Sequence, residues 1–147
     1  MRAYLRNRMA VREKTEFVPN KIYFITFTIL DWQKVFVTDE YCALVYKWFD
    51  YVKERYGNKI HGYVIMPNHI HLLMYVSEKS PVLSKLIQNA KRFLAYGLVK
   101  LLKRDKRIDV LDIFSARADV TRGSLHKVFE DRYDSKIIES EALLPSE

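Results

Sequence analysis

Two histidines separated by one apolar residue are the side chains of this sequence best suited to chemistry. His69 and His71 lie in the run NHIHLLMYV, whose alternation of apolar and polar residues predicts a β-strand. Side chains alternate across a strand, so both imidazoles point to the same face. Their Cα atoms are then about 7 Å apart, which lets both rings approach one divalent cation. The alternative is a pair of half-exposed strand histidines without a ligand.

Two imidazoles do not complete a metal site, because a catalytic zinc ion generally has three protein ligands. His61 or His126 is a candidate for the third ligand. Glu139 or Glu141 is a carboxylate candidate if a last helix folds over the sheet, although both are equally explained as solvent-exposed helix charges. The spacing of these residues does not choose among them.

The histidine strand is one of several alternating strands and helices. The run KIYFITFTIL at 21–30 is rich in β-branched and aromatic residues and predicts a first strand. Thr38 is typical of a helix N-cap, and apolar residues at helical spacing continue to Gly57-Asn58. KIHGYVIMP and NHIHLLMYV then predict a hairpin that turns at Pro67-Asn68.

Further elements follow the hairpin. Ser80 and Pro81 have the residue types of an N-cap and a first helical residue, and the apolar face of this second helix ends near Lys103. The segment 108–114 fits a short helix or a strand, and both are left open. The remaining predictions are a loop at 121–123, a fourth strand at 126–133 and a short last helix at 135–144.

The order strand, helix, strand, strand, helix, strand predicts an α+β, ferredoxin-like fold. Such a fold has a four-stranded antiparallel sheet with two helices on one face, here with a short C-terminal helix in addition. The apolar residues that should face the helices are Ile70, Leu72, Met74 and Val76 in the third strand and Ile60, Val64 and Met66 in the second. The uncovered face should then collect His61, Tyr63, His69, His71 and Tyr75 with Phe24, Thr26 and Thr28.

Size and composition fit one domain. The chain has 147 residues, of which 49% are hydrophobic, and we expect a single domain at 21–147 preceded by a basic arm at 1–20. The formal charge of +7 suits a polyanionic partner. Cys42 is the only cysteine, which excludes an intrachain disulfide framework and fits a cytoplasmic location. No apolar stretch approaches the ~20 residues of a membrane span.

The string Met66-Pro67-Asn68-His69-Ile70-His71-Leu72-Leu73 resembles the His-hydrophobic-His signature of the HUH-type tyrosine transposases. The longer segment GYVIMPNHIHLL is similar to the IS200-like branch that includes the REP-associated transposases. This resemblance extends over about residues 20–140, with SKLIQNAKRFLAYGL and HKVFEDRYDSKII matching more loosely.

The resemblance implies a mechanism and a partner. In this family two histidines, here His69 and His71, and a third polar side chain hold Mg²⁺ or Mn²⁺ at the scissile phosphate. A tyrosine attacks the phosphorus and forms a 5′-phosphotyrosine intermediate that is later rejoined to another DNA end. The implied activity is DNA transposition by cleavage and rejoining of single-stranded or hairpin DNA.

The tyrosine is the point at which this sequence departs from the family pattern. A motif of the type Tyr-Ile-x-x-Asn-Pro is expected shortly after FEDRYDSKII, where this chain reads ESEALLPSE. Tyr96 and Tyr133 are the candidate substitutes. Three explanations remain open: a C-terminal truncation, a substitute tyrosine, or a catalytically inactive nucleic-acid-binding remnant. A small zinc or manganese hydrolase unrelated to DNA is a further hypothesis.

The second long helix carries a candidate DNA-binding stripe. At 100° per residue, Tyr96 shares one face of this helix with a set of cations: Lys85, Arg92, Lys100 and Lys103. Cations can neutralise phosphates while an aromatic ring stacks on a base. The alternative is an ordinary solvated helix face. The sequence also leaves open whether the protein is a homodimer.

Overall fold

Four antiparallel strands form one sheet in the order β2-β3-β1-β4. The computed structural model describes residues 17–138. Its strands are β1 (Lys21–Ile29), β2 (Lys59–Met66), β3 (His69–Val76) and β4 (Phe129–Ile138), and its helices are α2 (Asp39–Tyr56), α3 (Leu83–Arg104) and α4 (Ile108–Ala116). Two short 3-10 turns, η1 (Leu30–Trp32) and η2 (Val120–Arg122), complete the elements.

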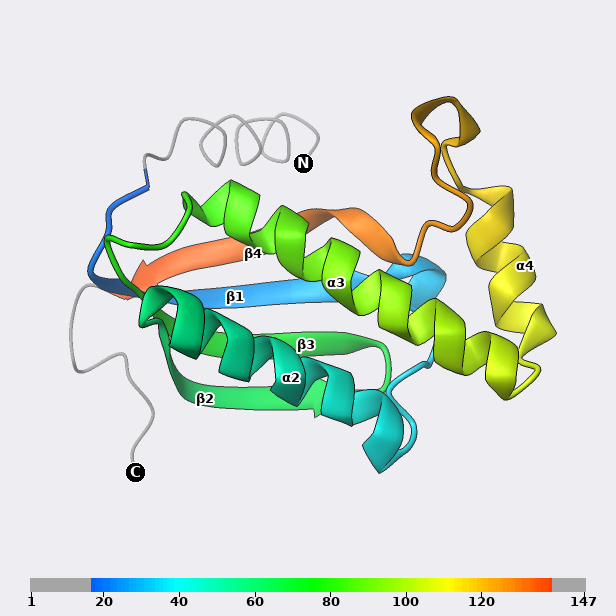
Figure 1. Cartoon of the computed structure of the whole chain (residues 1–147), viewed down its shortest axis with the longest axis horizontal. Coiled ribbons are helices and arrows are strands. Elements are labelled where there is room, and N and C mark those ends of the chain that lie inside the picture. The colour runs from blue at the N-terminus through cyan, green and yellow to red at the C-terminus, as the bar shows by residue number, and fades with distance from the viewer. Residues whose placement is uncertain (1–16, 139–147) are drawn as a thin grey trace, which may run out of the picture.

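Helices α2 and α3 lie side by side on one face of the sheet, and α4 packs near the end of α3 (Figure 1). No helix between residues 17 and 138 lies on the other face (Figure 1). This arrangement confirms the ferredoxin-like fold. The segment 108–114, which the sequence left open, is part of helix α4 because Val110, Leu111 and Phe114 recur at helical spacing and are buried.

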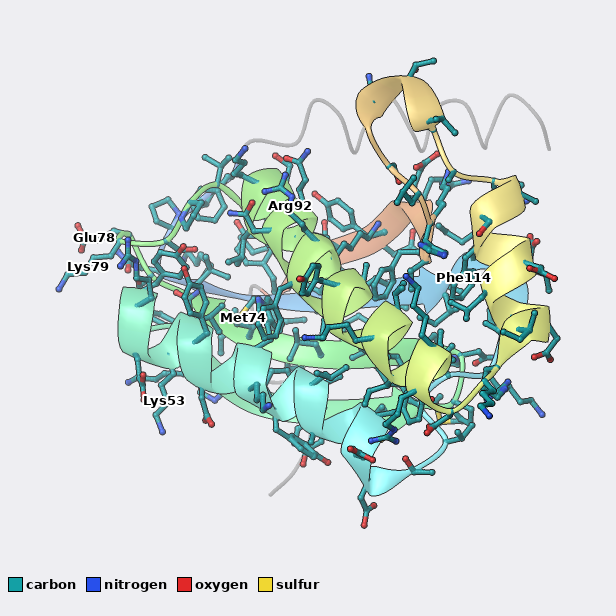
Figure 2. The ribbon with its side chains drawn as sticks, turned by 45° about the vertical axis from the view of Figure 1, so that its right-hand side comes forward. Lys53, Met74, Glu78, Lys79, Arg92 and Phe114 are labelled. Carbon is teal, nitrogen blue, oxygen red and sulfur yellow. The ribbon has the colours of Figure 1, made fainter. Side chains whose placement is uncertain are left out.

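The core lies between the sheet and the two long helices. The residues of β3 that were predicted to face the helices, Ile70, Leu72, Met74 and Val76, are all buried. Met74 lies in the layer between the strands and the helices (Figure 2). Tyr23, Ile25, Phe27 and Ile29 of β1 are buried in the same core. The alternation predicted for these two strands is therefore confirmed.

A β-bulge interrupts the pairing of β2 with β3. Ile60 lies opposite Met74 and Gly62 lies opposite Leu73, so His61 is an additional residue in β2. A bulge of this kind shifts the alternation of every residue that follows it in the strand. No residue type in KIHGYVIM marks this position unambiguously.

The bulge makes the predicted orientation of β2 wrong beyond His61. Tyr63 was expected on the uncovered face, but its ring packs 5.2 Å from the ring of Phe49 in α2. Val64 and Met66 were expected in the core, but they lie opposite His71 and His69 and are exposed. The uncovered face therefore gains two apolar side chains beside the histidines and does not contain Tyr63.

The predicted last helix at 135–144 is wrong for the part that the structure describes. Strand β4 continues to Ile138, and Asp134 to Ile138 pair with Thr26 to Ile22 of β1. The edge of β1 supplies backbone donors and acceptors that a helix at this place would leave without partners. Residues 139–144 lie outside the described residues. The strand also begins at Phe129, three residues later than predicted.

Helix α3 starts at Leu83, two residues after the predicted start at Pro81. The Ser80 hydroxyl does not cap the helix, because it accepts a hydrogen bond from Asn58 Nδ2 at 3.3 Å and donates one to the Pro81 carbonyl at 3.0 Å. Asn58 is 0% exposed, and its Oδ1 accepts the Ser77 N–H at 2.9 Å. This amide ties the end of α2 to the loop before α3.

Replacing Asn58 by alanine is expected to lower the free energy of unfolding by about 2 kcal/mol, because the buried Ser77 N–H would lose its acceptor. Urea denaturation followed by circular dichroism measures the change. Gln88→Ala, at an exposed position of α3, serves as the control and should stay within about 0.5 kcal/mol of the parent protein. Equal stability of the two variants would contradict a structural role for Asn58.

Candidate functional site

The two histidines of β3 lie next to each other on the uncovered face of the sheet. Their ring centroids are 4.7 Å apart and the ring planes cross at 84°. Both side chains are half-buried, whereas Ile70 between them is buried in the core. The strand alternation that was read from the sequence therefore brings the two imidazoles together.

Each imidazole is oriented through its Nδ1 atom. The Nδ1 of His69 lies 2.7 Å from Asn68 Oδ1, which accepts a hydrogen bond from Nδ1–H. The Nδ1 of His71 lies 2.9 Å from Thr26 Oγ1 on the neighbouring strand β1. With Nδ1 engaged in both rings, Nε2 is the nitrogen left for a ligand. Histidines that bind metals are generally fixed in this manner by a hydrogen bond to the other ring nitrogen.

The electrostatic surroundings favour a neutral His71. Burial lowers the pKa of this imidazole, and the neighbouring His69 lowers it further. Only a neutral imidazole has a lone pair for a metal ion. The ring is thus kept in the form that a divalent cation requires.

Two aromatic side chains pack directly on the histidines. The Phe24 ring stacks on His71 with 5.7 Å between centroids and 13° between planes. The Trp32 ring meets His69 edge-on at 5.7 Å, and this tryptophan is 60% exposed. Together with Val64 and Met66, they place an exposed apolar rim around the imidazole pair.

Trp32 was not found by sequence reasoning, because its position depends on an unusual turn after β1. Asp31 and Trp32 have φ angles of 52° and 54°, in the left-handed region that side chains other than glycine rarely adopt. Glu130 holds this turn by accepting the Asp31 N–H at 2.9 Å, and Arg117 pairs with the Asp31 carboxylate at 3.2 Å. The strained backbone turns the indole toward His69.

A hollow of about 410 Å³ lies beside this turn. The side chains from β1 and η1 that line it include Thr26, Thr28 and Trp32. The opposite wall carries three cations and three acids, which are Arg117, Lys127, Arg132, Glu130, Asp131 and Asp134. The hollow, whose lining also includes Tyr133, adjoins Thr26 and Trp32, the side chains that contact His71 and His69.

The candidates for a third ligand do not join the pair. His61 lines a separate hollow with Phe49 and Asp50 on the α2 side of the sheet. His126 lies in another hollow beside α3, where burial and Lys103 lower its pKa. Glu139 and Glu141 lie outside the described residues. Within 17–138, no group of three histidine, cysteine or acidic side chains is close enough to hold a metal ion.

Asp134 is the acidic residue in the same row of the sheet as His71. Thr26 pairs with His71 on one side and with Asp134 on the other, so all three share the uncovered face. Two strand spacings place the Cα atoms of Asp134 and His71 about 10 Å apart. Asp134 can therefore contribute negative charge near the histidines, but it is not close enough to share one metal ion with them. Sequence reasoning missed it because the segment from 135 was expected to be helical.

The two candidate tyrosines lie at different places relative to the histidines. Tyr96 is on α3 and is 73% exposed on the helical side of the molecule. Tyr133 lies opposite Phe27, whose side chain is in the core, and its ring centroid is 5.8 Å from Lys91 Nζ on α3. Tyr96 is thus on the side of the sheet away from the imidazole pair. Tyr133 packs toward α3, but it also lines the hollow with Thr26 and Trp32 beside the pair.

The predicted DNA-binding side chains lie on the outer face of α3. Arg92, Tyr96 and Lys100 line a groove between α2 and α3, whereas Lys85 and Lys103 are exposed on the same helix outside the groove lining. The five side chains are therefore exposed on one helix, and their role in DNA binding stays a prediction.

The fold and the site together define a class of protein: a ferredoxin-like domain that carries a His-hydrophobic-His pair on a middle strand of its sheet. The chain belongs to the family described as "Transposase IS200 like", whose model matches residues 18–136. A search of curated proteins found no match.

Solved structures share the fold. The chain is similar to a REP-associated tyrosine transposase bound to a REP hairpin, with a TM-score of 0.59 and 14% identity over 88% of this chain. It spans 62% of the length of that protein's chain. It is also similar to a Deinococcus radiodurans protein assigned as a transposase, with a TM-score of 0.57 and 15% identity over 86% of this chain and 85% of the other. Of the helices between residues 17 and 138, none has the length and apolar character to cross a membrane.

Proposed function

We propose that this protein acts in DNA transposition, and that its histidine pair binds a divalent cation at which single-stranded or hairpin DNA is cleaved and rejoined. The observation that carries the proposal is the adjacent pair of imidazoles on the uncovered face, each oriented through Nδ1. Membership of the IS200-like transposase family supports DNA as the substrate. The similar transposase bound to a REP hairpin supports a DNA hairpin as the form of that substrate.

The donor set fits a cation that keeps open coordination positions. His69 and His71 would hold it through Nε2, and the remaining positions would be left for water and phosphate oxygens. A bound Mg²⁺ or Mn²⁺ would stabilise negative charge on the oxygens of the reacting phosphate. Imidazole nitrogen is a better ligand for Mn²⁺ than for Mg²⁺, so we expect higher affinity for Mn²⁺.

The residues around the pair suit an unpaired DNA strand. Asn68 and Thr26 hold the two rings, so little reorganisation is needed when a ligand binds. Trp32 and Phe24 offer exposed ring surface on which unpaired bases can stack. A base in a duplex is already stacked on both sides and cannot use these rings, which favours single-stranded DNA.

A second candidate function is DNA binding without cleavage. Its support is the position of Tyr96, which is exposed on the helical side, and of Tyr133, whose ring packs toward Lys91 of α3. In this alternative the domain keeps the cation site and the DNA contacts of a transposase but performs no phosphotyrosine chemistry.

Covalent trapping separates the two functions. The protein is incubated with labelled hairpins that carry single-stranded flanks and with Mn²⁺, and is then analysed on a denaturing gel. A denaturant-resistant adduct is expected for cleavage through a tyrosine, and mass spectrometry of the adduct identifies that residue. Binding that salt weakens, with no adduct and no nicked DNA, would support the binding function. Absence of both DNA binding and cleavage would reject the two proposals together.

A further inference from the structure

A groove between α2 and α3 lies on the face of the molecule opposite to the histidines. Its volume is about 940 Å³. The two helices approach closely at Gly97, where an added Cβ would lie 2.7 Å from Leu44 Cδ2. On either side of this contact, longer side chains from both helices form the walls: Lys47, Tyr51, Asn89, Arg92, Phe93, Tyr96 and Lys100.

The groove carries positive charge only. Lys47, Arg92 and Lys100 line it, and no acidic side chain does. None of these three cations forms an ion pair with another residue between 17 and 138. Arg92 projects from α3 toward the solvent (Figure 2). This differs from the neighbouring hollow by β4, where Lys127 and Arg122 are paired with Asp131 and Asp119.

Three aromatic rings are exposed among these cations. Tyr51 is 50% exposed, Phe93 is 44% exposed and Tyr96 is 73% exposed. The Lys100 Nζ atom lies 5.6 Å from the centre of the Tyr96 ring. Surfaces that bind single-stranded nucleic acid combine exposed aromatic rings with cations. The bases stack on the rings, and the phosphates contact the cations.

We propose that the α2–α3 groove binds unpaired nucleotides of a DNA strand outside the segment that reacts at the histidines. The choice of DNA rests on the proposed function. A duplex would use the cations but not the rings, since its bases are stacked on each other. A second copy of this chain is disfavoured because a symmetric contact would bring Lys47, Arg92 and Lys100 toward the same cations of the partner.

The position of the groove determines whether it can affect DNA affinity or the rate of cleavage. The sheet and the helical layer separate it from His69 and His71, so the same nucleotides cannot contact both places. The groove should therefore set the affinity for DNA with long unpaired flanks, while the rate of cleavage at saturating DNA should not depend on it.

The test is fluorescence anisotropy with a labelled single-stranded oligothymidine and a duplex of equal length, both in EDTA. Tyr96→Ala should weaken single-strand binding about tenfold, as expected for the loss of one stacked base, while Tyr96→Phe should retain it. Arg92→Ala/Lys100→Ala should also weaken binding about tenfold and reduce the slope of log affinity against log salt by about 1.4, or 0.7 for each phosphate contact.

A matched control removes the same charge elsewhere. Lys53→Ala/Lys79→Ala deletes two exposed cations that lie outside the groove lining (Figure 2). Affinity within about threefold of the parent protein is expected for this control, since only diffuse attraction is reduced. An equal loss in both double variants would mean that net charge, and not the groove, holds the strand, and the proposal would be overturned.

Three other results would also overturn it. These are unchanged single-strand binding by Tyr96→Ala, an equal loss of duplex binding in that variant, and a change of its mass in light scattering that identifies the groove as a protein interface. Failure of cleavage in the trapping experiment leaves this binding result intact, so the two proposals are tested separately.

Discussion

Replacing His69 or His71 by alanine is expected to reduce Mn²⁺-dependent nicking of single-stranded DNA at least about 100-fold. Loss of one of two protein ligands removes the cation, whose stabilisation of charge at a reacting phosphate is worth several kcal/mol, and each 1.36 kcal/mol is about a factor of ten in rate. Gel assays of nicking and calorimetry with Mn²⁺ measure the two effects. If the protein only binds DNA, the calorimetric loss alone is expected.

The histidine variants should remain folded. Both side chains lie on the uncovered face, so the free energy of unfolding should fall by no more than about 1 kcal/mol. His61→Ala is the matched control, because this histidine is exposed in a separate hollow on the α2 side. Unchanged Mn²⁺ binding in His69→Ala, or an equal loss in His61→Ala, would show that the pair is not the cation site.

Thr26→Val is expected to weaken Mn²⁺ binding and nicking by about 10- to 100-fold without changing either histidine. Valine has nearly the shape of threonine, but it removes the hydroxyl that holds His71 Nδ1 at 2.9 Å. The ring would lose the hydrogen bond that fixes its orientation. The Mn²⁺ titration of the variant at neutral pH measures this effect.

Thr28→Val tests whether the hydrogen bond is the cause. Thr28 is on the same strand and face and lies opposite His69, but within residues 17–138 no hydrogen bond joins its hydroxyl to either histidine. Its replacement makes the same chemical change two residues away. Equal losses in the two valine variants would assign the effect to packing beside the sheet and would reject the orienting role of Thr26.

The two proposed functional surfaces lie on opposite faces of the domain. The imidazole pair and its aromatic rim offer a place for chemistry on one face, and the α2–α3 groove offers affinity on the other. Trp32 and Tyr96 are the exposed rings of these two surfaces. Their separation is useful experimentally, because a groove variant should leave Mn²⁺ binding at the histidines unchanged.

Much of the fold followed from local pattern. The alternation in β1 and β3 predicted which side chains enter the core, since a strand without a bulge has a strict period of two. The start of α2 after Thr38 and its end at Gly57 followed from residue types that suit helix ends, and Gly57 has the expected left-handed conformation. His69, Ile70 and His71 lie in such a regular strand, which is why the imidazole pair was predicted with the correct orientation.

Predictions failed where a distant part of the chain decides local structure. The bulge at His61 reversed the faces of Tyr63 and Val64, because one additional residue shifts all that follow. The segment 135–138 is a strand because β1 offers a paired edge, although its residues also suit a helix. Ser80 bonds with Asn58 and therefore does not cap α3.

The sequence by itself determined the sheet, the two long helices and the common direction of His69 and His71, because these depend on the period of neighbouring residues. Only the tertiary structure decided that Thr26 and Asn68 orient the rings, that Trp32 lies against His69, and that Tyr96 is on the opposite side. It also brought Lys47 and Tyr51 of α2 next to Arg92 and Tyr96 of α3. The physical reason is that such contacts join residues far apart in the chain, whose approach depends on strand register and helix packing and not on any local repeat.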